Sequence, residues 1–337
     1  MQNRVSDIGY RTTGYVIAKL LERLQPLLLT ERVCTPFRIP KRKTKTALWR
    51  RYERLSRFTG PLPEYVSPSG QQLTATDVTA ELEYYGSRVN VSDVIMDTHE
   101  DPVLDDATDN IKDLAAETIE VNRIAVMKAG SNVFYAGGAA VDTRVEVASE
   151  ITLPDLKRVV RSMKGNRVKK ITDIVSATAK VATEPIAPAY IALHHTDVSG
   201  DIANLAGFTP IEKYSNDGVI LPGEIGKVEQ VRFCESDLFE PWEAAGAANA
   251  SYTYLSSRAY SNSACDVYPI LILGKQAVGT VALQGKNAIE IFVHNPVSET
   301  GDELARKGYV AVKFLQATAI LNQLCIARLE VACKYAQ

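Results

Sequence analysis

The sequence is poor in the residues that enzymes and metalloproteins use for chemistry. Its 337 residues include only 4 histidines and 5 cysteines, and no two cysteines have the C-x-x-C spacing of zinc and redox motifs. An odd number of cysteines does not suit a disulfide framework, so we expect buried free thiols and a reducing compartment. Cys234 or Cys265 would need a histidine base to act as a nucleophile, and no local signature supplies one.

Motifs for nucleotides and membranes are also absent. No P-loop and no G-x-G-x-x-G fingerprint occurs. No apolar run reaches the about 18 residues that a membrane-spanning helix needs. His194 and His195 end a predicted strand, where neighbours point to opposite faces and cannot share one metal. We therefore predict that the protein is not an enzyme and uses no cofactor or metal.

The sequence does have an ordinary globular composition with a very uneven distribution of charge. Apolar residues make up 46% and charged residues 23%, which is typical of a folded protein of mixed α and β structure. Residues 1–58 contain 14 Lys+Arg against 4 Asp+Glu, whereas residues 59–130 contain 4 against 14. These blocks predict that one segment lies on the other, within one copy or between neighbouring copies.

The basic segment is predicted to form an extended arm. Residues 36–45 contain too few apolar side chains to form a core of their own. We expect the arm to lie on acidic surface, most favourably that of a neighbouring copy, through Arg42, Lys43, Lys45, Arg50 and Arg51. Two alternatives stay open, a solvated basic loop and an arm that binds nucleic acid.

An alternating segment follows the arm. Val78, Ala80, Leu82 and Tyr84 are predicted to share one face of a strand, with acidic and polar residues on the other. A short strand at Val89–Val91 would complete a hairpin, with a turn-rich tip from Gly60 to Gly70 before it. Because an isolated hairpin is marginally stable in water, we expect Val78, Leu82 and Tyr84 to contact a neighbouring subunit.

Helical patterns flank the glycine-rich segment Asn132–Gly138. A helix is predicted from Ile17 to Leu28, and a much longer one runs from an N-cap at Asp101, with Pro102 next, to Ala129. A third, from Thr152 to Met163, has Thr152 and Asp155 at capping-box spacing.

The second half reads as short strands. They are expected at 190–194, 228–233, 267–273, 277–283 and 288–294, with a helix near 197–205. The segment 240–265 is predicted to be a long loop, which normally indicates binding or mobility. The tail from Gly308 suits two strands or a strand and a helix.

This order of parts resembles the major capsid fold of tailed bacteriophages and herpesviruses, the Hong Kong ninety-seven-type fold. Several sequence strings resemble the major capsid proteins of N-four-like podophages in particular, most specifically Asp97-Thr-His-Glu-Asp-Pro102. The others include Ser67–Thr74, Tyr84–Gly86, Ala115–Thr118, Asn132–Gly138, Tyr190–His194, Val219–Gly226, Val231–Phe233, Asp266–Pro269 and Leu273–Lys275. The resemblance begins near residue 60, and neither the basic arm nor loop 240–265 belongs to it.

The resemblance implies an α+β fold divided into an arm, a hairpin loop, a spine helix and two domains. The ranges are 1–58 for the basic N-terminal arm, 59–100 for the extended hairpin loop and its base, 101–165 for the peripheral domain with the spine helix, 166–305 for the axial domain, and 306–337 for C-terminal strands at their junction. It also implies a structural protein of the virion capsid. Hexamers and pentamers would form an icosahedral head in the host cytoplasm.

The implied partners are further copies of the chain, a scaffolding protein, a portal protein at one vertex, a possible cement protein and packaged double-stranded DNA, with no membrane. The sequence shows no charged helical leader, so a separate scaffolding protein is expected. Two other functions remain open: a nanocompartment shell of the same fold, and a nucleic-acid-binding protein acting through the basic arm. Some relatives of this fold link a hairpin lysine to a neighbour's asparagine. Residues 60–100 contain no lysine, so no such bond is expected there.

Overall fold

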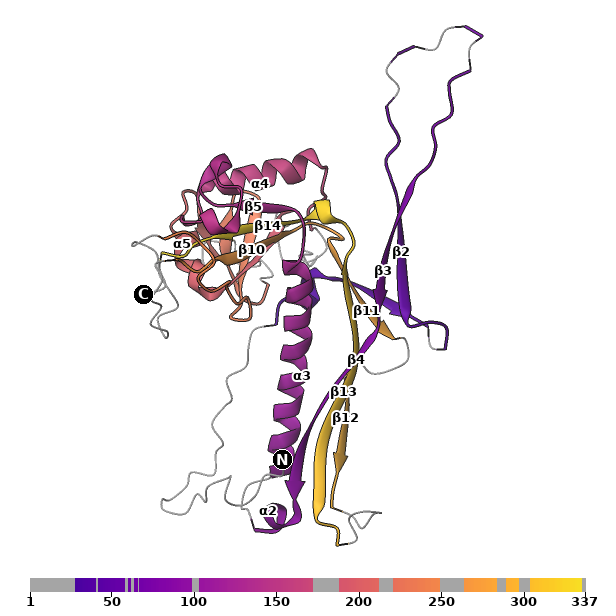
Figure 1. Ribbon diagram of the computed structural model, residues 1–337, viewed down its shortest axis with the longest axis vertical. Coiled ribbons are helices and arrows are strands. Elements are labelled where there is room, and N and C mark those ends of the chain that lie inside the picture. The colour runs from indigo at the N-terminus through magenta and orange to yellow at the C-terminus, as the bar shows by residue number, and fades with distance from the viewer. Residues whose placement is uncertain are drawn as a thin grey trace, which may run out of the picture.

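A computed structural model describes residues 28–40, 42–57, 60–61, 64–65, 67–98, 103–171, 188–211, 221–248, 264–283, 289–296 and 304–334. The predicted helix at Ile17–Leu28 and the cap at Asp101 and Pro102 lie outside these residues, apart from Leu28. The chain forms one seven-stranded sheet, one five-stranded sheet and a separate two-stranded hairpin (Figure 1). No helix within the described ranges is long and apolar enough to cross a membrane.

The seven-stranded sheet is the largest unit. Its strands, in spatial order, are β5 (Val133–Tyr135), β14 (Ile326–Val331), β10 (Tyr268–Leu273), β6 (Tyr190–His194), β9 (Val231–Glu235), β8 (Glu224–Val228) and β7 (Thr209–Pro210). The short helix α5 (Ser199–Ala203) follows β6. Alternation along β10 divides the two faces, because Ile270 and Ile272 belong to one buried cluster and Leu271 and Leu273 to another.

Helix α4 (Leu153–Gly165) covers one face of this sheet. The predicted capping is confirmed, because the Thr152 side chain accepts a hydrogen bond from the Asp155 backbone N–H. Its apolar stripe, Leu156, Val159, Val160 and Met163, is buried against the sheet. Helix α4 thus packs on the seven-stranded sheet, and the predicted domain range 101–165, which groups it with the spine helix, stays a prediction.

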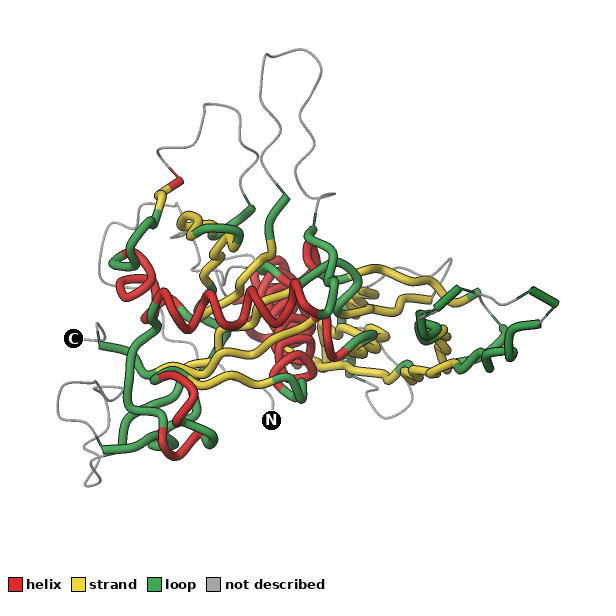
Figure 2. Tube along the Cα trace, turned by 90° about the horizontal axis from the view of Figure 1, so that it is seen from above, coloured by secondary structure: helices red, strands yellow, loops and turns green. Residues whose placement is uncertain are grey.

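The spine helix is α3 (Val103–Lys128), and it lies along the five-stranded sheet (Figures 1 and 2). That sheet contains β13 (Lys307–Ile320), which pairs with β4 (Glu83–Ser92) on one side and with β12 (Ile289–His294) and β11 (Val278–Leu283) on the other; β1 (Thr35–Ile39) adds to β11. Ala107, Ile111 and Ala115 of α3 share a buried cluster with Val310, Val312 and Phe314 of β13.

A short helix, α2 (Asp93–Thr98), follows β4, and α1 (Thr30–Val33) precedes β1. The C-terminal tail is therefore two strands, β13 and β14.

The hairpin differs from its prediction. β3 (Ala75–Glu81) pairs antiparallel with β2 (Thr46–Tyr52), not with the segment after Gly86, which belongs to β4 and pairs with β13. Half of the hairpin therefore comes from the segment predicted to be the arm. An earlier part of that segment, Thr35–Ile39, is extended as predicted, but it lies on β11 of its own chain. Figures 1 and 2 show the hairpin projecting away from both sheets.

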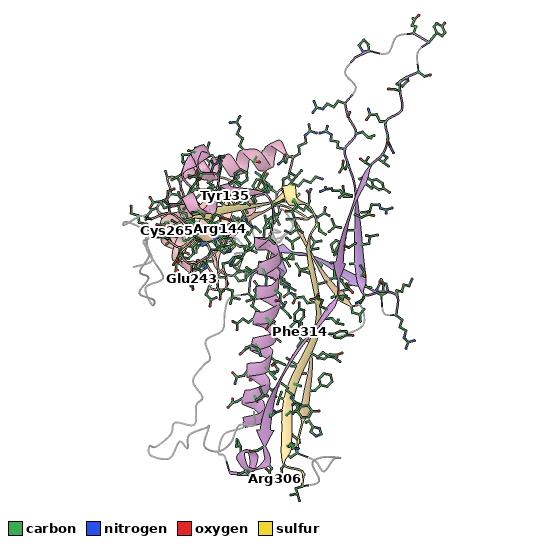
Figure 3. All side chains as sticks on the ribbon, viewed as in Figure 1. Tyr135, Arg144, Glu243, Cys265, Arg306 and Phe314 are labelled. Atoms are coloured by element: carbon green, nitrogen blue, oxygen red, sulfur yellow. The ribbon has the colours of Figure 1, made fainter. Side chains whose placement is uncertain are left out.

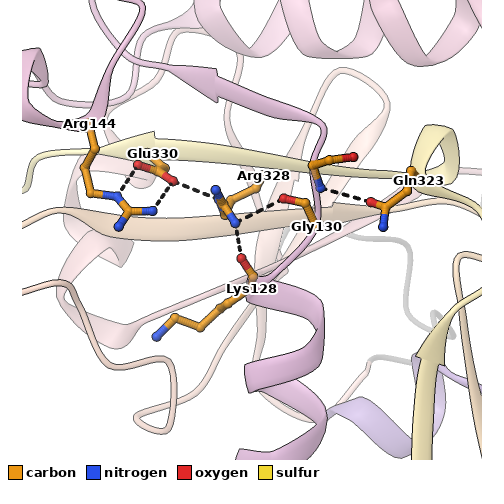
Figure 4. A network of polar contacts seen from close by, with 7 residues as sticks. Lys128, Gly130, Arg144, Gln323, Arg328 and Glu330 are labelled. Carbon is orange, nitrogen blue, oxygen red and sulfur yellow. Dashed lines mark hydrogen bonds and ion pairs between the residues drawn. The ribbon is translucent and has the colours of Figure 1, made fainter. Parts of the chain in front are cut away.

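A buried ionic network joins the end of α3 to the seven-stranded sheet (Figure 4). Arg144 donates two hydrogen bonds, of 2.7 and 2.9 Å, to the carboxylate of Glu330, which is fully buried. Arg328 pairs with the same carboxylate at 2.8 Å and donates to the carbonyls of Lys128 and Gly130. The dipole of a helix favours a cation at its C-terminus, and Arg328 supplies one there. The network therefore links the C-terminal end of α3 to strand β14 of the seven-stranded sheet.

Candidate assembly surface

The base of the hairpin is buried within its own chain. Ala80 and Leu82 form a cluster with Ile39, Val281 and Ala317, and Trp49 packs on it from β2. Leu82 is only 6% exposed. The expectation that this face needs a neighbouring subunit is therefore wrong for Ala80 and Leu82, because strands β1, β11 and β13 of the same chain already cover them.

The outer part of the hairpin is different. Five large apolar side chains of the hairpin are exposed: Leu48 near its base, and Tyr52, Leu55, Tyr65 and Leu73 farther out. Beyond β2 and β3 its two limbs stay connected by sparse hydrogen bonds, such as Glu53 N–H to the Thr74 carbonyl at 2.9 Å. Figure 3 shows these limbs extended away from the remaining side chains. A row of exposed apolar side chains on a projecting element is typical of a surface that another molecule covers.

The charge blocks do meet, but within one chain. Arg50 of β2 donates to both carboxylate oxygens of Asp77 of β3, each at 2.8 Å, and Lys45 pairs with Glu81. The hydrogen bond from Arg50 lowers the pKa of Asp77. Lys45 and Arg50 therefore have acidic partners in their own chain, and contact of the arm with a neighbour's acidic surface stays a prediction. Arg42, Lys43 and Arg51 are exposed, and within the described ranges none has an ion-pair partner.

The remaining predicted contact residues divide in two. Val78 is half-buried on the covered face of β3, whereas Tyr84 is 67% exposed. The predicted alternation ends at Leu82, which lies between β3 and β4. Tyr84 belongs to β4, which pairs with β13, and it lies opposite Leu315. Lys313 lies 6.0 Å from its ring centroid. Tyr84 is thus available for contact, but on the five-stranded sheet and not on the hairpin.

One buried carboxylate was not anticipated from the sequence. Glu120 of α3 accepts hydrogen bonds from the backbone N–H groups of Leu29 and Thr30, both at 2.7 Å, and from the Thr30 hydroxyl. It connects the segment before β1 to the spine. Its spacing from Ile124 and Met127, four and seven residues on, could have indicated that it lies on the buried face.

The described residues offer little for catalysis. All five cysteines are free and four are buried, as predicted, and burial raises the pKa of Cys34 to about 12. Such thiols are protonated and unreactive at neutral pH. His194 is fully buried, and burial lowers its pKa to about 4. Among the residues that the structure describes, no three His, Cys, Asp or Glu side chains are grouped so as to bind a metal.

Comparison with known proteins gives one curated relative. No protein-family model matches the sequence. The chain is 26% identical over 253 residues to a protein named "Major capsid protein" from Pseudomonas phage KPP21. The match covers 69% of this chain but only 62% of the relative's length.

Solved structures show the fold. The capsid of Ralstonia phage GP4 superposes with a TM-score of 0.67 at 11% identity, covering 96% of both chains. The head protein of Helicobacter pylori bacteriophage KHP40 gives 0.64 at 11% identity, over 98% of this chain and 97% of that one. The holo-SrpI encapsulin complex from Synechococcus elongatus PCC 7942 gives 0.53 at 10% identity, over 90% and 87%. The resemblance to phage major capsid proteins is therefore confirmed, and the chain has the predicted α+β capsid fold. Membership of the N-four-like podophage family in particular stays a prediction.

Proposed function

We propose that this chain is the major capsid protein of a tailed bacteriophage. Copies of it form hexamers and pentamers that close into an icosahedral head around double-stranded DNA, so it belongs to the virion capsid. Assembly takes place in the host cytoplasm with a separate scaffolding protein and a portal at one vertex, and a cement protein is a further candidate partner. The chain acts structurally and not as an enzyme.

The projecting hairpin is the observation that carries this proposal. A monomeric protein gains nothing from an element that extends beyond its core with five large apolar side chains exposed. A shell subunit needs such an element to overlap the next subunit, and the capsid fold supplies the context in which many copies repeat the same contact. The raised pKa of Cys34 and the lowered pKa of the buried His194 are consistent with a structural role, because neither group is placed to act in catalysis.

A nanocompartment shell is the second candidate, because an encapsulin complex shares the fold at a lower TM-score than the phage capsids. The curated relative favours the phage capsid. Nucleic-acid binding through the basic arm is weaker, since Lys45 and Arg50 already pair with acidic side chains of the same chain.

Expression of the full chain, with and without a candidate scaffolding protein, tests the proposal. Negative-stain images should show closed shells, and purified virions should contain this polypeptide as the most abundant protein. A soluble monomer under all assembly conditions would contradict a shell function. Shells that enclose a host enzyme and no DNA would favour the nanocompartment.

A further inference from the structure

The two faces of the seven-stranded sheet carry opposite charge. Residues 156–171, which are helix α4 after its first turn and the segment that follows, contain seven Lys or Arg and no Asp or Glu; the acidic residue of the first turn, Asp155, is buried and pairs with Arg158. On the opposite face, residues 235–243 contain four Asp or Glu and no Lys or Arg. We name these surfaces the basic ridge and the acidic segment.

Burial shows that they lie on opposite faces. The basic ridge packs through Val160 and Met163 in the cluster that includes Ile270 and Ile272 of β10. The acidic segment packs through Phe239, fully buried, in the cluster of Leu271 and Leu273. In Figure 3, Glu243 accordingly lies on the lower side of this unit, whereas α4 runs along its upper side.

The charges of the basic ridge are available for contact. Arg161, Lys164, Arg167 and Lys169 are exposed, and no described acidic side chain pairs with any of them. Lys157 is different, because it lies 3.2 Å from Glu229 of its own chain. Asp237 and Glu240 are exposed on the acidic segment, although Lys128 lies close to Glu240 and donates to its backbone carbonyl at 2.7 Å.

We propose that the basic ridge of one copy docks on the acidic segment of the next copy in a head-to-tail ring. Contacts between two different surfaces of identical chains generate rings when the rotation closes. Placing the surfaces on opposite faces of one sheet lets every copy use both at once. The proposal deepens the shell function, since it assigns a specific contact within each hexamer and pentamer.

Packaged DNA is the competing occupant of the ridge, because phosphates attract exposed Lys and Arg without apolar contacts. The presence of a complementary acidic surface on the opposite sheet face favours a second copy. The experiment below separates the two.

Charge reversal on each surface tests the contact. The variant Arg161→Glu/Lys164→Glu should place acid against acid, and Asp237→Lys/Glu240→Lys should place base against base. Each variant alone should lower the yield of assembled particles by about tenfold or more at low salt, because like-charge contacts oppose association. All four changes in one chain should restore assembly. The matched control, Asp109→Lys/Lys112→Asp on the spine helix, keeps an exposed ion pair outside both surfaces and should assemble normally.

Mixing the two reversed variants gives a sharper readout. Every contact between unlike variants is then complementary, so the copies must alternate around a ring. Only even-membered rings can alternate, and native mass spectrometry should detect mixed hexamers but no mixed pentamers. Closed heads should be absent from the mixture, since they need pentamers.

Several outcomes would overturn the inference. Normal shells from Arg161→Glu/Lys164→Glu that merely lose DNA in salt would assign the ridge to DNA. Reversed variants that unfold at a lower temperature than wild type, without rescue by the four-residue swap, would show an effect on folding and not on docking. Wild-type chains that never assemble would instead contradict the shell function itself.

Discussion

The base of the hairpin and its outer part are continuous along the chain but depend on different partners. At the base, Ala80 and Leu82 are covered by three strands of the same chain. Farther out, beyond β2 and β3, Leu55 and Leu73 expose apolar side chains that the described chain leaves uncovered. The base can therefore form in a free subunit, whereas the outer part gains its apolar burial only on contact with another molecule.

This division separates folding from assembly within one element. A hairpin anchored at its base keeps its direction in the monomer, so less conformational entropy is lost when the outer part docks. A hairpin held entirely by a neighbour would have to order completely on assembly. Substitutions at the two ends of the hairpin should therefore affect different measurements. The four predictions below, one of which concerns the seven-stranded sheet, run from the largest expected change in monomer stability to the smallest.

Leu82→Asp should have the largest effect. It introduces a carboxylate into a cluster where Leu82 is 6% exposed, which should reduce the free energy of unfolding by about 3–5 kcal/mol. Chemical denaturation of the free subunit measures this. The volume-conserving Leu82→Met should cost less than about 1.5 kcal/mol. If Leu82→Asp left the monomer's stability unchanged and blocked only assembly, the base would depend on a neighbour after all.

His194 should make the seven-stranded sheet sensitive to acid while the hairpin is not. Burial lowers the pKa of His194 to about 4, whereas it is near 6.5 in the unfolded chain. The unfolded state therefore binds the proton first as pH falls, and stability is lost between about pH 6.5 and 4, by about 3 kcal/mol. Denaturation of wild type and His194→Phe across this range should show a smaller loss for the variant.

Hydrogen exchange at pH 5 locates that effect. Strands β6 and β10 should lose protection in wild type relative to pH 7, after correction for intrinsic rates, and the paired residues of β2 and β3 should not. Equal loss in both places would mean that the hairpin base and the sheet unfold together.

The local structure could be predicted from the sequence where the signal is local. Short apolar segments identified β6, β10, β11 and β12, and the spacing of Thr152 and Asp155 identified the start of α4. The long apolar periodicity also placed α3 correctly. In each case the residues that specify the element lie within the element or directly beside it.

Pairing between distant strands could not be predicted in this way. β2 and β3 are separated by residues 53–74, and the basic side chains of β2 obscured the alternation of Ala47 and Trp49. Tyr84 was assigned to the wrong face because a single residue, Leu82, separates β3 from β4 and changes the pairing partner. The role of Glu120 depends on Leu29 and Thr30, which are about ninety residues away in sequence.

The ion pair between Arg50 and Asp77 should have only a small effect on stability. Both side chains are solvent-exposed, and exposed pairs contribute little because water and salt screen them. Since Arg50 lowers the pKa of Asp77, the pair stabilises the hairpin above the usual aspartate pKa and this contribution is lost as pH falls. Arg50→Gln should raise the Asp77 pKa toward its usual value, as followed by NMR titration, with no measurable change in the unfolding midpoint.

Substitutions on the outer part should have the smallest effect on the monomer and a large one on the shell. Leu55 and Leu73 are exposed, so Leu55→Asp and Leu73→Asp remove no buried contact within the described chain and should leave the unfolding midpoint unchanged. Each should prevent shell assembly, because a charge in an apolar interface must be desolvated without a partner. Leu55→Met is the matched control and should assemble.

Hydrogen exchange then compares the two parts of the hairpin directly. In free subunits, residues 53–57 and 67–74 should exchange fast while β2 and β3 are protected, and in shells all of them should be slow. The hairpin contains no lysine between Thr46 and Glu81, so boiled shells on a denaturing gel should run at monomer mass. Slow exchange of the outer limbs in the free subunit would mean that the chain itself covers them. The claim that the outer part of the hairpin becomes buried only on assembly would then be wrong.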